Sequence, residues 1–170
     1  MLTVHAYTND QNTLDGPHPK GDLRRARAAA ANIVPNSTGA AKAIGLVLPS
    51  LKGKLDGSAQ RVPTITGSLT ELTTILSKKT TVEELNDIMR KYALEGDLVE
   101  QIKYSLNNEL VSSDIVGTSA PSIFDSNATI VSADGNNIVM YIWYDNEYGY
   151  SHQVIRLAKL IAKVRRLTYY

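Results

Sequence analysis

Two stretches of the chain repeat apolar residues at the spacing of an α-helix. The first follows Thr81-Val82-Glu83-Glu84, a sequence that predicts a capping box at a helix start. The apolar positions that we expect to face the core from this helix are Val82, Leu85, Met89, Tyr92 and Ala93. The second stretch predicts a C-terminal helix over about residues 150–164, and its apolar positions are Val154, Leu157, Ala158, Ile161 and Val164.

A shorter helix is predicted between Thr38, which we expect to be its N-cap, and Pro49, which ends it. Strands are predicted where β-favouring residues cluster between turn formers. These runs are Thr3–Tyr7, Gln60–Thr66 and Leu69–Leu76, and Asp134-Gly135 predicts a hairpin turn between residues 128–133 and 138–144.

Together these elements predict an α+β fold in which a mixed, largely antiparallel sheet has helices on one face and a closing C-terminal helix. The chain has 170 residues, of which 43% are hydrophobic, so we expect residues 1–170 to form one domain. A net charge of +1 gives no global preference for nucleic acid or an anionic membrane. The chain contains neither a long apolar run nor a signal-peptide pattern, so we expect no membrane span and a cytoplasmic protein.

The chain contains no cysteine, which excludes disulfides, thiolate metal sites and a cysteine nucleophile within these residues. Its histidines and carboxylates show no spacing typical of a metal site, and no G-x-G-x-x-G occurs. We therefore expect neither a metal site nor a complete dinucleotide-binding motif here.

Several residues could take part in chemistry or anion binding. His5 is expected at the end of a strand, where an imidazole can meet a substrate. Three groups could each bind a phosphate. They are the guanidinium of Arg25, the pair Thr8 and Arg61, and the free N–H groups expected where a helix starts at Thr38-Gly39. Taken singly, each feature is more often structural: a surface histidine, a helix cap or a solvated arginine.

Five segments taken together, in this order, resemble phosphorylating glyceraldehyde-3-phosphate dehydrogenases. The segments are Thr3-Val4-His5-Ala6-Tyr7-Thr8-Asn9-Asp10-Gln11, Leu23-Arg24-Arg25-Ala26-Arg27, Ser37-Thr38-Gly39-Ala40-Ala41-Lys42, Arg61-Val62-Pro63-Thr64 and Trp143-Tyr144-Asp145-Asn146-Glu147-Tyr148-Gly149-Tyr150-Ser151. The resemblance covers nearly the whole chain but only the second half of the family's protein. It implies the family's catalytic domain, without the Rossmann half and without the nucleophilic cysteine.

The resemblance also implies an irregular segment, the S-loop, over about residues 9–33, packed at a subunit interface. Helix propensity over Leu23–Ala31, with Asp22 as a possible N-cap, favours a helix in the same stretch. We follow the resemblance, because tertiary context often overrides propensity. The S-loop is about two residues longer than is usual in the family.

Roles for single residues follow from the resemblance alone. His5 matches the histidine that activates the cysteine thiolate and accepts a proton as hydride leaves. Thr8 and Arg61 match the site for the phosphate of glyceraldehyde 3-phosphate, whereas Arg25, Thr38 and Gly39 match the site for inorganic phosphate. For the cofactor NAD, Asn146 matches the residue that binds the nicotinamide carboxamide. Tyr150 is expected to wall that pocket, and Pro17 resembles the NAD-preferring pattern.

The family forms homo-oligomers, typically tetramers, and this chain is expected to associate as well. Because it lacks the nucleophile and the Rossmann half, we expect no dehydrogenase activity from it alone. We also expect an exposed apolar face that includes much of the last helix.

Two alternatives remain open. One is the sibling activity on erythrose 4-phosphate, although the intact Ser37–Lys42 segment fits the triose enzyme better. The other is a non-catalytic binding module, either a surface adhesin or an RNA-associated protein. Its basic contacts would be Arg24, Arg25, Arg27, Lys163, Arg165 and Arg166.

Overall fold

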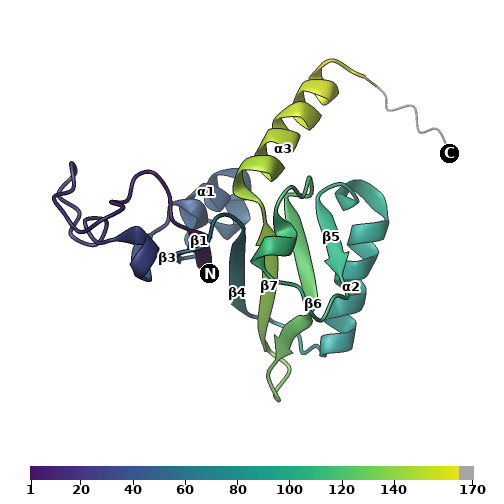
Figure 1. Ribbon diagram of the computed structural model, residues 1–170. Coiled ribbons are helices and arrows are strands. Elements are labelled where there is room, and N and C mark those ends of the chain that lie inside the picture. The colour runs from purple at the N-terminus through teal and green to yellow at the C-terminus, as the bar shows by residue number, and fades with distance from the viewer. Residues whose placement is uncertain (165–170) are drawn as a thin grey trace.

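The computed structural model describes residues 1–164, in which one seven-stranded sheet forms the centre of the molecule (Figure 1). The strands are β1 (Leu2–Ala6), β2 (Val34–Ser37), β3 (Ser58–Val62), β4 (Ser68–Ile75), β5 (Ile102–Ser105), β6 (Ser122–Val131) and β7 (Asn137–Tyr144). The α-helices of the described residues are α1 (Ala40–Val47), α2 (Val82–Leu94) and α3 (Asn146–Ile161).

The strand order is β2-β3-β1-β4-β7-β6-β5. Only the β1–β3 and β5–β6 pairs are parallel, and the other four neighbouring pairs are antiparallel. The α+β fold with a mixed, largely antiparallel sheet and a C-terminal helix is therefore confirmed.

The N-terminal strand β1 lies inside the sheet, between β3 and β4. Its last residues pair on both sides, so that His5 lies beside Arg61 of β3 and beside Ser68 of β4. Ser68 in turn pairs with Tyr144, the last residue of β7. One row of side chains thus crosses four strands and includes Arg61, His5 and Tyr144.

The β6–β7 hairpin is confirmed at the turn predicted from Asp134-Gly135. Gly135 adopts a φ of 78°, and a Cβ atom there would lie 3.1 Å from the backbone oxygen of Thr80. Glycine meets both demands of this turn. The core below the hairpin is formed by buried Ile115, Ile123, Phe124 and Ile138.

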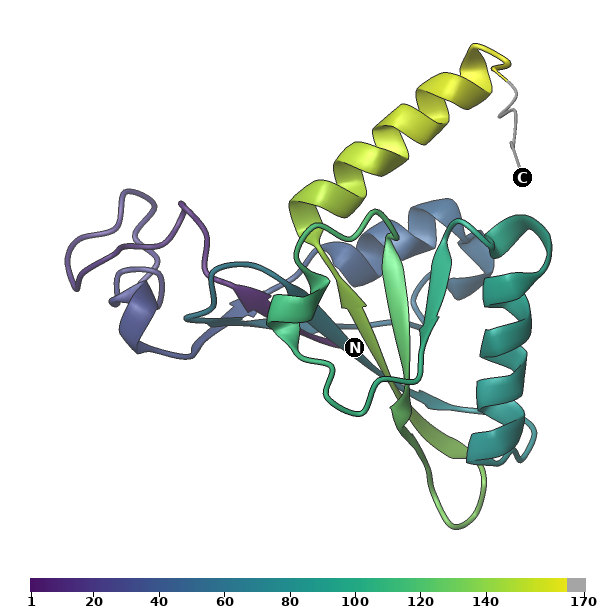
Figure 2. The ribbon, with the colours of Figure 1, turned by 45° about the vertical axis from the view of Figure 1, so that its right-hand side comes forward.

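Helix α2 starts with the predicted capping box. Thr81 Oγ1 accepts a hydrogen bond from the Glu84 N–H at 3.1 Å, and Glu84 Oε2 accepts one from the Thr81 N–H at 3.1 Å. The helix packs over β5 and β6 at one edge of the sheet (Figure 2). Leu85 and Ala93 are buried there.

The apolar stripe predicted for α2 is wider than its contact with the sheet. Val82 is 37% exposed and Tyr92 is 50% exposed, so neither faces the core as predicted. The helix lies mainly over β5 and β6, and the narrow row that repeats every four residues through Leu85 and Ala93 makes this contact.

The predicted N-cap of α1 is wrong by one residue. The cap position is Gly39, which has no side chain of its own to cap the helix. Gly39 already has helical angles, φ −85° and ψ −5°, so the chain turns into the helix one residue after Thr38. Thr38 instead accepts a hydrogen bond at Oγ1 from the Ala40 N–H at 3.2 Å.

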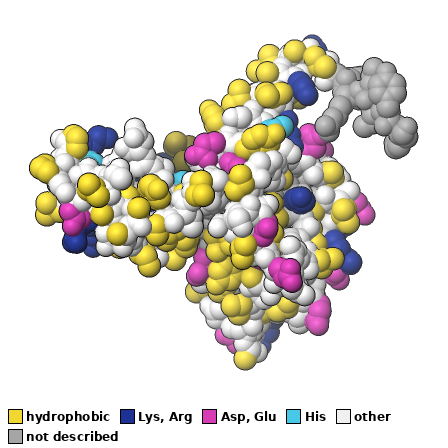
Figure 3. All heavy atoms as spheres, in the orientation of Figure 1, with side chains coloured by type: hydrophobic (Ala, Val, Ile, Leu, Met, Phe, Trp, Pro, Cys, Tyr) yellow, Lys and Arg dark blue, Asp and Glu magenta, His cyan; other side chains and the backbone are white. Residues whose placement is uncertain are grey.

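Helix α3 begins at Asn146 and ends at Ile161, a few residues earlier at each end than the range expected from the sequence. It projects from the end of β7 instead of closing over the sheet (Figures 1 and 2). Val154, Leu157 and Ile161 of its predicted stripe are 47%, 57% and 73% exposed, and Figure 3 shows hydrophobic atoms along this helix. The face that a core would cover is open to solvent.

The segment from Tyr7 to Ile33 is irregular apart from a short 3-10 turn at Ala29–Ala31. Asp22 Oδ1 accepts hydrogen bonds from the N–H groups of Arg24 and Arg25, both at 3.0 Å, but only a turn follows. The segment extends from the β1–β3 side of the sheet, away from α2 (Figure 1). No helix in the described part of the chain is both long and apolar enough to span a bilayer.

Candidate functional site

His5 is placed by the sheet at the end of β1, directly beside Arg61. Arg61 Nη1 lies 2.6 Å from His5 Nδ1 and donates to the carbonyl oxygen of Ala6 at 3.0 Å. The ring of Tyr144 lies edge-on to the imidazole, with centroids 6.3 Å apart and planes at 68°. The sheet register, the guanidinium and the tyrosine therefore hold the imidazole from three sides.

The arginine determines which ring nitrogen of His5 holds the proton. A guanidinium has only donors, so its contact with Nδ1 is a hydrogen bond when Nδ1 accepts. In a neutral imidazole the proton is then on Nε2. The Ala6 carbonyl oxygen lies 2.8 Å from Nδ1 and would be the acceptor for an Nδ1–H if Arg61 moved away.

Tyr144 is a protonated neighbour of this site. Burial raises the pKa of its phenol, although hydrogen bonds with Ser68, Thr70 and Thr3 and the charge of Arg61 partly oppose that rise. The phenol therefore remains neutral at physiological pH and adds no charge beside the imidazole.

The carboxylate of Asp10 joins three of the residues proposed to bind phosphate. Thr8 Oγ1 donates a hydrogen bond to Asp10 Oδ1, and Arg25 Nη1 forms an ion pair with Asp10 Oδ2 at 2.7 Å. The Thr8 hydrogen bond and the charges of Arg25 and Arg61 lower the pKa of Asp10 against an opposing effect of burial. Asp10 is thus an anion bound by the hydroxyl of Thr8 and the guanidinium of Arg25, with the charge of Arg61 acting on it as well.

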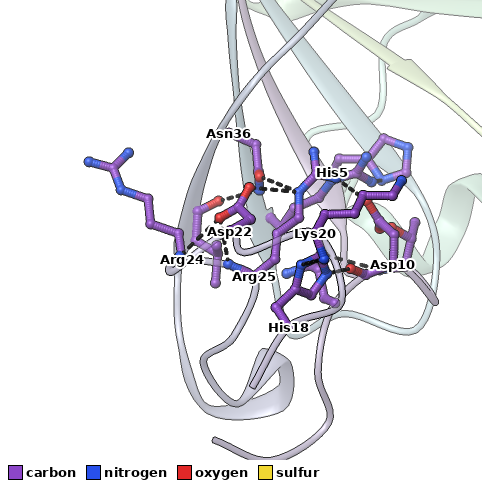
Figure 4. A network of polar contacts seen from close by, with 12 residues as sticks. His5, Asp10, His18, Lys20, Asp22, Arg24, Arg25 and Asn36 are labelled. Carbon is purple, nitrogen blue, oxygen red and sulfur yellow. Dashed lines mark hydrogen bonds and ion pairs between the residues drawn. The ribbon is translucent and has the colours of Figure 1, made fainter. Parts of the chain in front are cut away.

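Arg25 connects the irregular segment to the sheet, as Figure 4 shows. Its Nε donates to Asn36 Oδ1 of β2 at 3.1 Å and lies 3.4 Å from Asp22 Oδ2. Its Nη1 faces Asp10 on the other side. Contacts on both sides hold the guanidinium between β2 and the loop that follows β1.

His18 also ties the irregular segment to the site. Its Nε2 lies 2.8 Å from the backbone oxygen of Asp10, and its Nδ1 accepts from the Lys20 N–H at 3.3 Å (Figure 4). Pro17 lies in the exposed bend just before His18, and its carbonyl accepts from Asn12 Nδ2 at 3.1 Å.

Thr38 and Gly39 lie apart from His5. In the sheet, Arg61 pairs with Val34, whereas Ser37 pairs with Ser58 three positions along β3. At about 3.3 Å per residue the helix start is roughly 10 Å further along the strands. A Cβ atom on Gly57 would lie 3.3 Å from Thr38 Cγ2, which places Thr38 beside the turn before β3.

Asn146 is presented at the first turn of α3 by a buried cap. Asp145 is 5% exposed, and its Oδ1 accepts from the N–H groups of Glu147 and Tyr148 at 3.1 and 2.9 Å. Its Oδ2 accepts from the Gly117 N–H at 2.9 Å. Asn146 is exposed and follows Tyr144, the neighbour of His5, by two residues. Tyr150, one turn further, is 71% exposed.

The structure therefore brings His5, Thr8, Arg25 and Arg61 together and places Thr38-Gly39 further along the sheet. Asp10 was not predicted as a site residue, although its position two residues after Thr8 is a signal for a local side-chain hydrogen bond. Within residues 1–164, no group of three His, Cys, Asp or Glu side chains could hold a metal ion.

Comparisons of the sequence with a family model and with curated proteins point to the same family. The family model described as "Glyceraldehyde 3-phosphate dehydrogenase, C-terminal domain" matches residues 1–146. Glyceraldehyde-3-phosphate dehydrogenases of Clostridium pasteurianum, Clostridium acetobutylicum and Streptococcus pyogenes are 56%, 54% and 54% identical over 168 residues. Each alignment covers 98% of this chain and 48% of the relative, so the chain spans about half the length of the curated relatives it matches.

Proposed function

This chain belongs to the glyceraldehyde-3-phosphate dehydrogenase family, as its C-terminal domain, and from that premise we propose that it supplies the histidine and the phosphate-binding side chains of a phosphorylating, NAD-dependent dehydrogenase. The whole enzyme would oxidise glyceraldehyde 3-phosphate through a cysteine thioester and transfer the acyl group to inorganic phosphate. The observation that most supports this proposal is the contact of Arg61 Nη1 with His5 Nδ1 at 2.6 Å, which joins the proposed base to a proposed phosphate ligand.

In this proposal Arg61 has two successive roles. While Arg61 donates to Nδ1, the proton of His5 is on Nε2, which can donate a hydrogen bond to a thiolate. When the phosphate of the substrate draws Arg61 away, the imidazole can release its Nε2 proton to water and take up a water proton on Nδ1, where the Ala6 carbonyl oxygen accepts the resulting Nδ1–H. Nε2 is then a free base that can accept the hydroxyl proton as hydride leaves the substrate carbon. Substrate binding would thus prepare the base.

Two anion sites are needed because the reaction joins a phosphorylated aldehyde to inorganic phosphate. Thr8 and Arg61 are proposed to hold the substrate phosphate, through a hydroxyl and a guanidinium. Arg25 is proposed to act with Thr38 and Gly39 on inorganic phosphate. Arg25 Nε contacts Asn36, which lies two residues before Thr38. This contact supports a position for Arg25 between the Thr8–Arg61 pair and the Thr38-Gly39 helix start.

NAD is proposed as the cofactor, and when bound it supplies the hydride acceptor. The residue proposed to bind the nicotinamide carboxamide is Asn146, whose side chain is exposed at a helix start fixed by the buried Asp145. Tyr150 and Pro17 are proposed as the wall of the nicotinamide pocket and as part of an NAD-preferring loop. The exposed side chains of Asn146 and Tyr150 fit contacts with a separate cofactor-binding half.

The 170 residues contain no cysteine, so the thiolate nucleophile must come from outside this sequence. We therefore propose that the chain alone has no dehydrogenase activity, and that the active form is a homo-oligomer of the complete enzyme. Activity on erythrose 4-phosphate is the alternative substrate for the same site, and a comparison of the two sugar phosphates on the complete enzyme distinguishes them.

A nucleic-acid-binding role has less support. Arg25 and Arg27 form ion pairs with Asp10 and Asp15 at 2.7 and 3.0 Å, which neutralise the basic cluster. Arg165 and Arg166, part of the same hypothesis, lie outside the described residues.

Binding of glycerol 3-phosphate to this chain tests the proposed phosphate site directly. Backbone amide chemical shifts report the binding, and the variant Arg61→Gln removes the proposed ligand. The matched control is Arg27→Gln, because it removes the same charge from an arginine that pairs with Asp15 and is not assigned to either phosphate site. We expect binding to weaken at least about tenfold in Arg61→Gln and to be unchanged in Arg27→Gln. Equal binding by all three proteins would contradict the proposal.

A further inference from the structure

Asp10 contacts two of the side chains that are proposed to bind phosphate. Its carboxylate accepts from Thr8 Oγ1 through Oδ1 and from Arg25 Nη1 through Oδ2. Arg61 lies close enough for its charge to act on the same carboxylate. Its two direct partners, Thr8 and Arg25, and the nearby Arg61 are the hydroxyl and the two guanidinium groups proposed to bind phosphate.

We propose that Asp10 is an internal anion that occupies the phosphate ligands of this chain and must be displaced before phosphate binds. The inference rests on the proposed function, because it takes Thr8, Arg25 and Arg61 to be phosphate ligands. Asp10 is then a residue that sets phosphate affinity by competition rather than a ligand of phosphate.

The chemistry of the two anions supports competition. A carboxylate and a phosphate both present oxygen pairs that match the fork of a guanidinium, so they compete for the same N–H donors. Phosphate carries more charge and more acceptor oxygens than a carboxylate, so at either anion site it can take over the donor that Asp10 now holds. A carboxylate left within contact distance of bound phosphate would be repelled.

The side chain of Asp10 is free to leave. It is 41% exposed, so it can rotate into water without a cavity forming. Arg25 remains held by Asn36 at 3.1 Å, and the backbone oxygen of Asp10 remains bound to His18 at 2.8 Å. Displacement therefore changes one side-chain position and leaves these two contacts, which Figure 4 shows, in place.

Titration of the 170-residue chain with inorganic phosphate, followed by amide chemical shifts, tests the inference. The variant Asp10→Asn keeps the size of the side chain and removes its charge, and Asp10→Ala is a second variant in case the amide forms new contacts. The control is Asp15→Asn, which removes a carboxylate paired with Arg27 elsewhere in the segment. Loss of an exposed, competing ion pair is expected to tighten phosphate binding by about threefold to tenfold in both Asp10 variants and not in the control.

A measurement on the unsubstituted chain is independent of folding in the variants. The carboxyl carbon of Asp10 can be titrated with and without saturating phosphate. Because Thr8, Arg25 and Arg61 lower the pKa of Asp10, their transfer to phosphate should move that pKa upward.

The outcomes separate this inference from the proposed function. Unchanged or weaker phosphate binding in Asp10→Asn and Asp10→Ala, with binding by the unsubstituted chain intact, overturns the role of Asp10 and leaves the phosphate site standing. An unshifted titration of Asp10 in saturating phosphate overturns it as well. Absence of phosphate binding in every protein overturns both the proposed site and this inference.

Discussion

Arg61 and His5 are 56 residues apart in sequence, yet the guanidinium Nη1 and the imidazole Nδ1 lie 2.6 Å apart. The contact exists because β1 enters the sheet in parallel register with β3, which pairs His5 with Arg61. A guanidinium cannot accept a hydrogen bond, so this contact favours the tautomer of His5 protonated at Nε2.

The tautomer of His5 can be measured by two-bond ¹H–¹⁵N correlation spectra of the imidazole. In the unsubstituted chain we expect Nδ1 to resonate as an unprotonated nitrogen and Nε2 as a protonated one. In Arg61→Met, Nδ1 is free to donate to the Ala6 carbonyl oxygen at 2.8 Å, and the proton should move to Nδ1. The same tautomer in both proteins would show that Arg61 does not select it.

The stability of the chain should fall in alkali through Tyr144. Burial raises the pKa of Tyr144 in the folded protein above the value of about 10 for an exposed phenol. A group with a raised folded-state pKa contributes stability that is complete below its unfolded pKa and is lost as pH rises through the folded one. The free energy of unfolding should therefore decline above about pH 10.

Urea unfolding between pH 8 and pH 11.5 in the unsubstituted chain and in Tyr144→Phe measures this decline. The variant should show a shallower decline, because it has no phenol to ionise at this position. Tyr150→Phe is the control, since Tyr150 is 71% exposed. Parallel pH profiles for the unsubstituted chain and Tyr144→Phe would contradict the assignment.

The capping box of α2 should contribute measurably to stability. Thr81→Ala removes the Oγ1 that accepts from the Glu84 N–H at 3.1 Å, and loss of such a cap costs about 1 kcal/mol of unfolding free energy. Thr81→Ser keeps the acceptor and should remain within about 0.5 kcal/mol of the unsubstituted chain. Equal losses in the two variants, measured by urea unfolding, would mean that the hydroxyl oxygen is not the cause.

Gly67, the residue just before β4, has no room for a side chain. Its φ is 87°, and a Cβ atom would lie 2.6 Å from the backbone oxygen of Ser112, which cannot move aside as a flexible side chain can. We expect Gly67→Ala to destabilise the chain by about 3 kcal/mol through backbone strain and steric overlap.

Gly53→Ala is the matched control for that substitution. Gly53 has a similar φ of 77°, but a Cβ atom there meets nothing within 4 Å. Only the cost of the left-handed conformation remains, about 1 kcal/mol. Thermal or urea unfolding that ranks the two variants in the opposite order would refute the steric argument.

Local sequence patterns predicted the features of this fold that depend on a few adjacent residues. Thr81-Val82-Glu83-Glu84 and Asp134-Gly135 contain their own capping and turn chemistry, and both predictions are confirmed. The cap at Thr38 was misplaced because glycine can take helical angles without a side chain to signal where the helix begins.

Features that depend on distant residues were not predictable in this way. The width of the buried stripe on α2 depends on which strands it covers, and Tyr92 extends beyond them. The role of Asp10 depends on the fold of the irregular segment, which brings Arg25 back to the end of β1. Family resemblance identified His5, Arg25 and Arg61 as candidates, but only the fold reveals the carboxylate that pairs with Arg25.

The central claim is that this chain supplies the base and the anion sites to a half that contributes the cysteine and the NAD platform. The most direct test replaces the matching half of the Clostridium pasteurianum relative with this chain, which is 56% identical, and follows NADH formed from glyceraldehyde 3-phosphate, NAD and phosphate. We predict activity for the chimera, none for the chain alone, and a loss of about 10²- to 10⁴-fold in kcat for the chimera with His5→Asn. A folded chimera that stays inactive, or one whose His5→Asn variant turns over as fast as its parent, would contradict the claim.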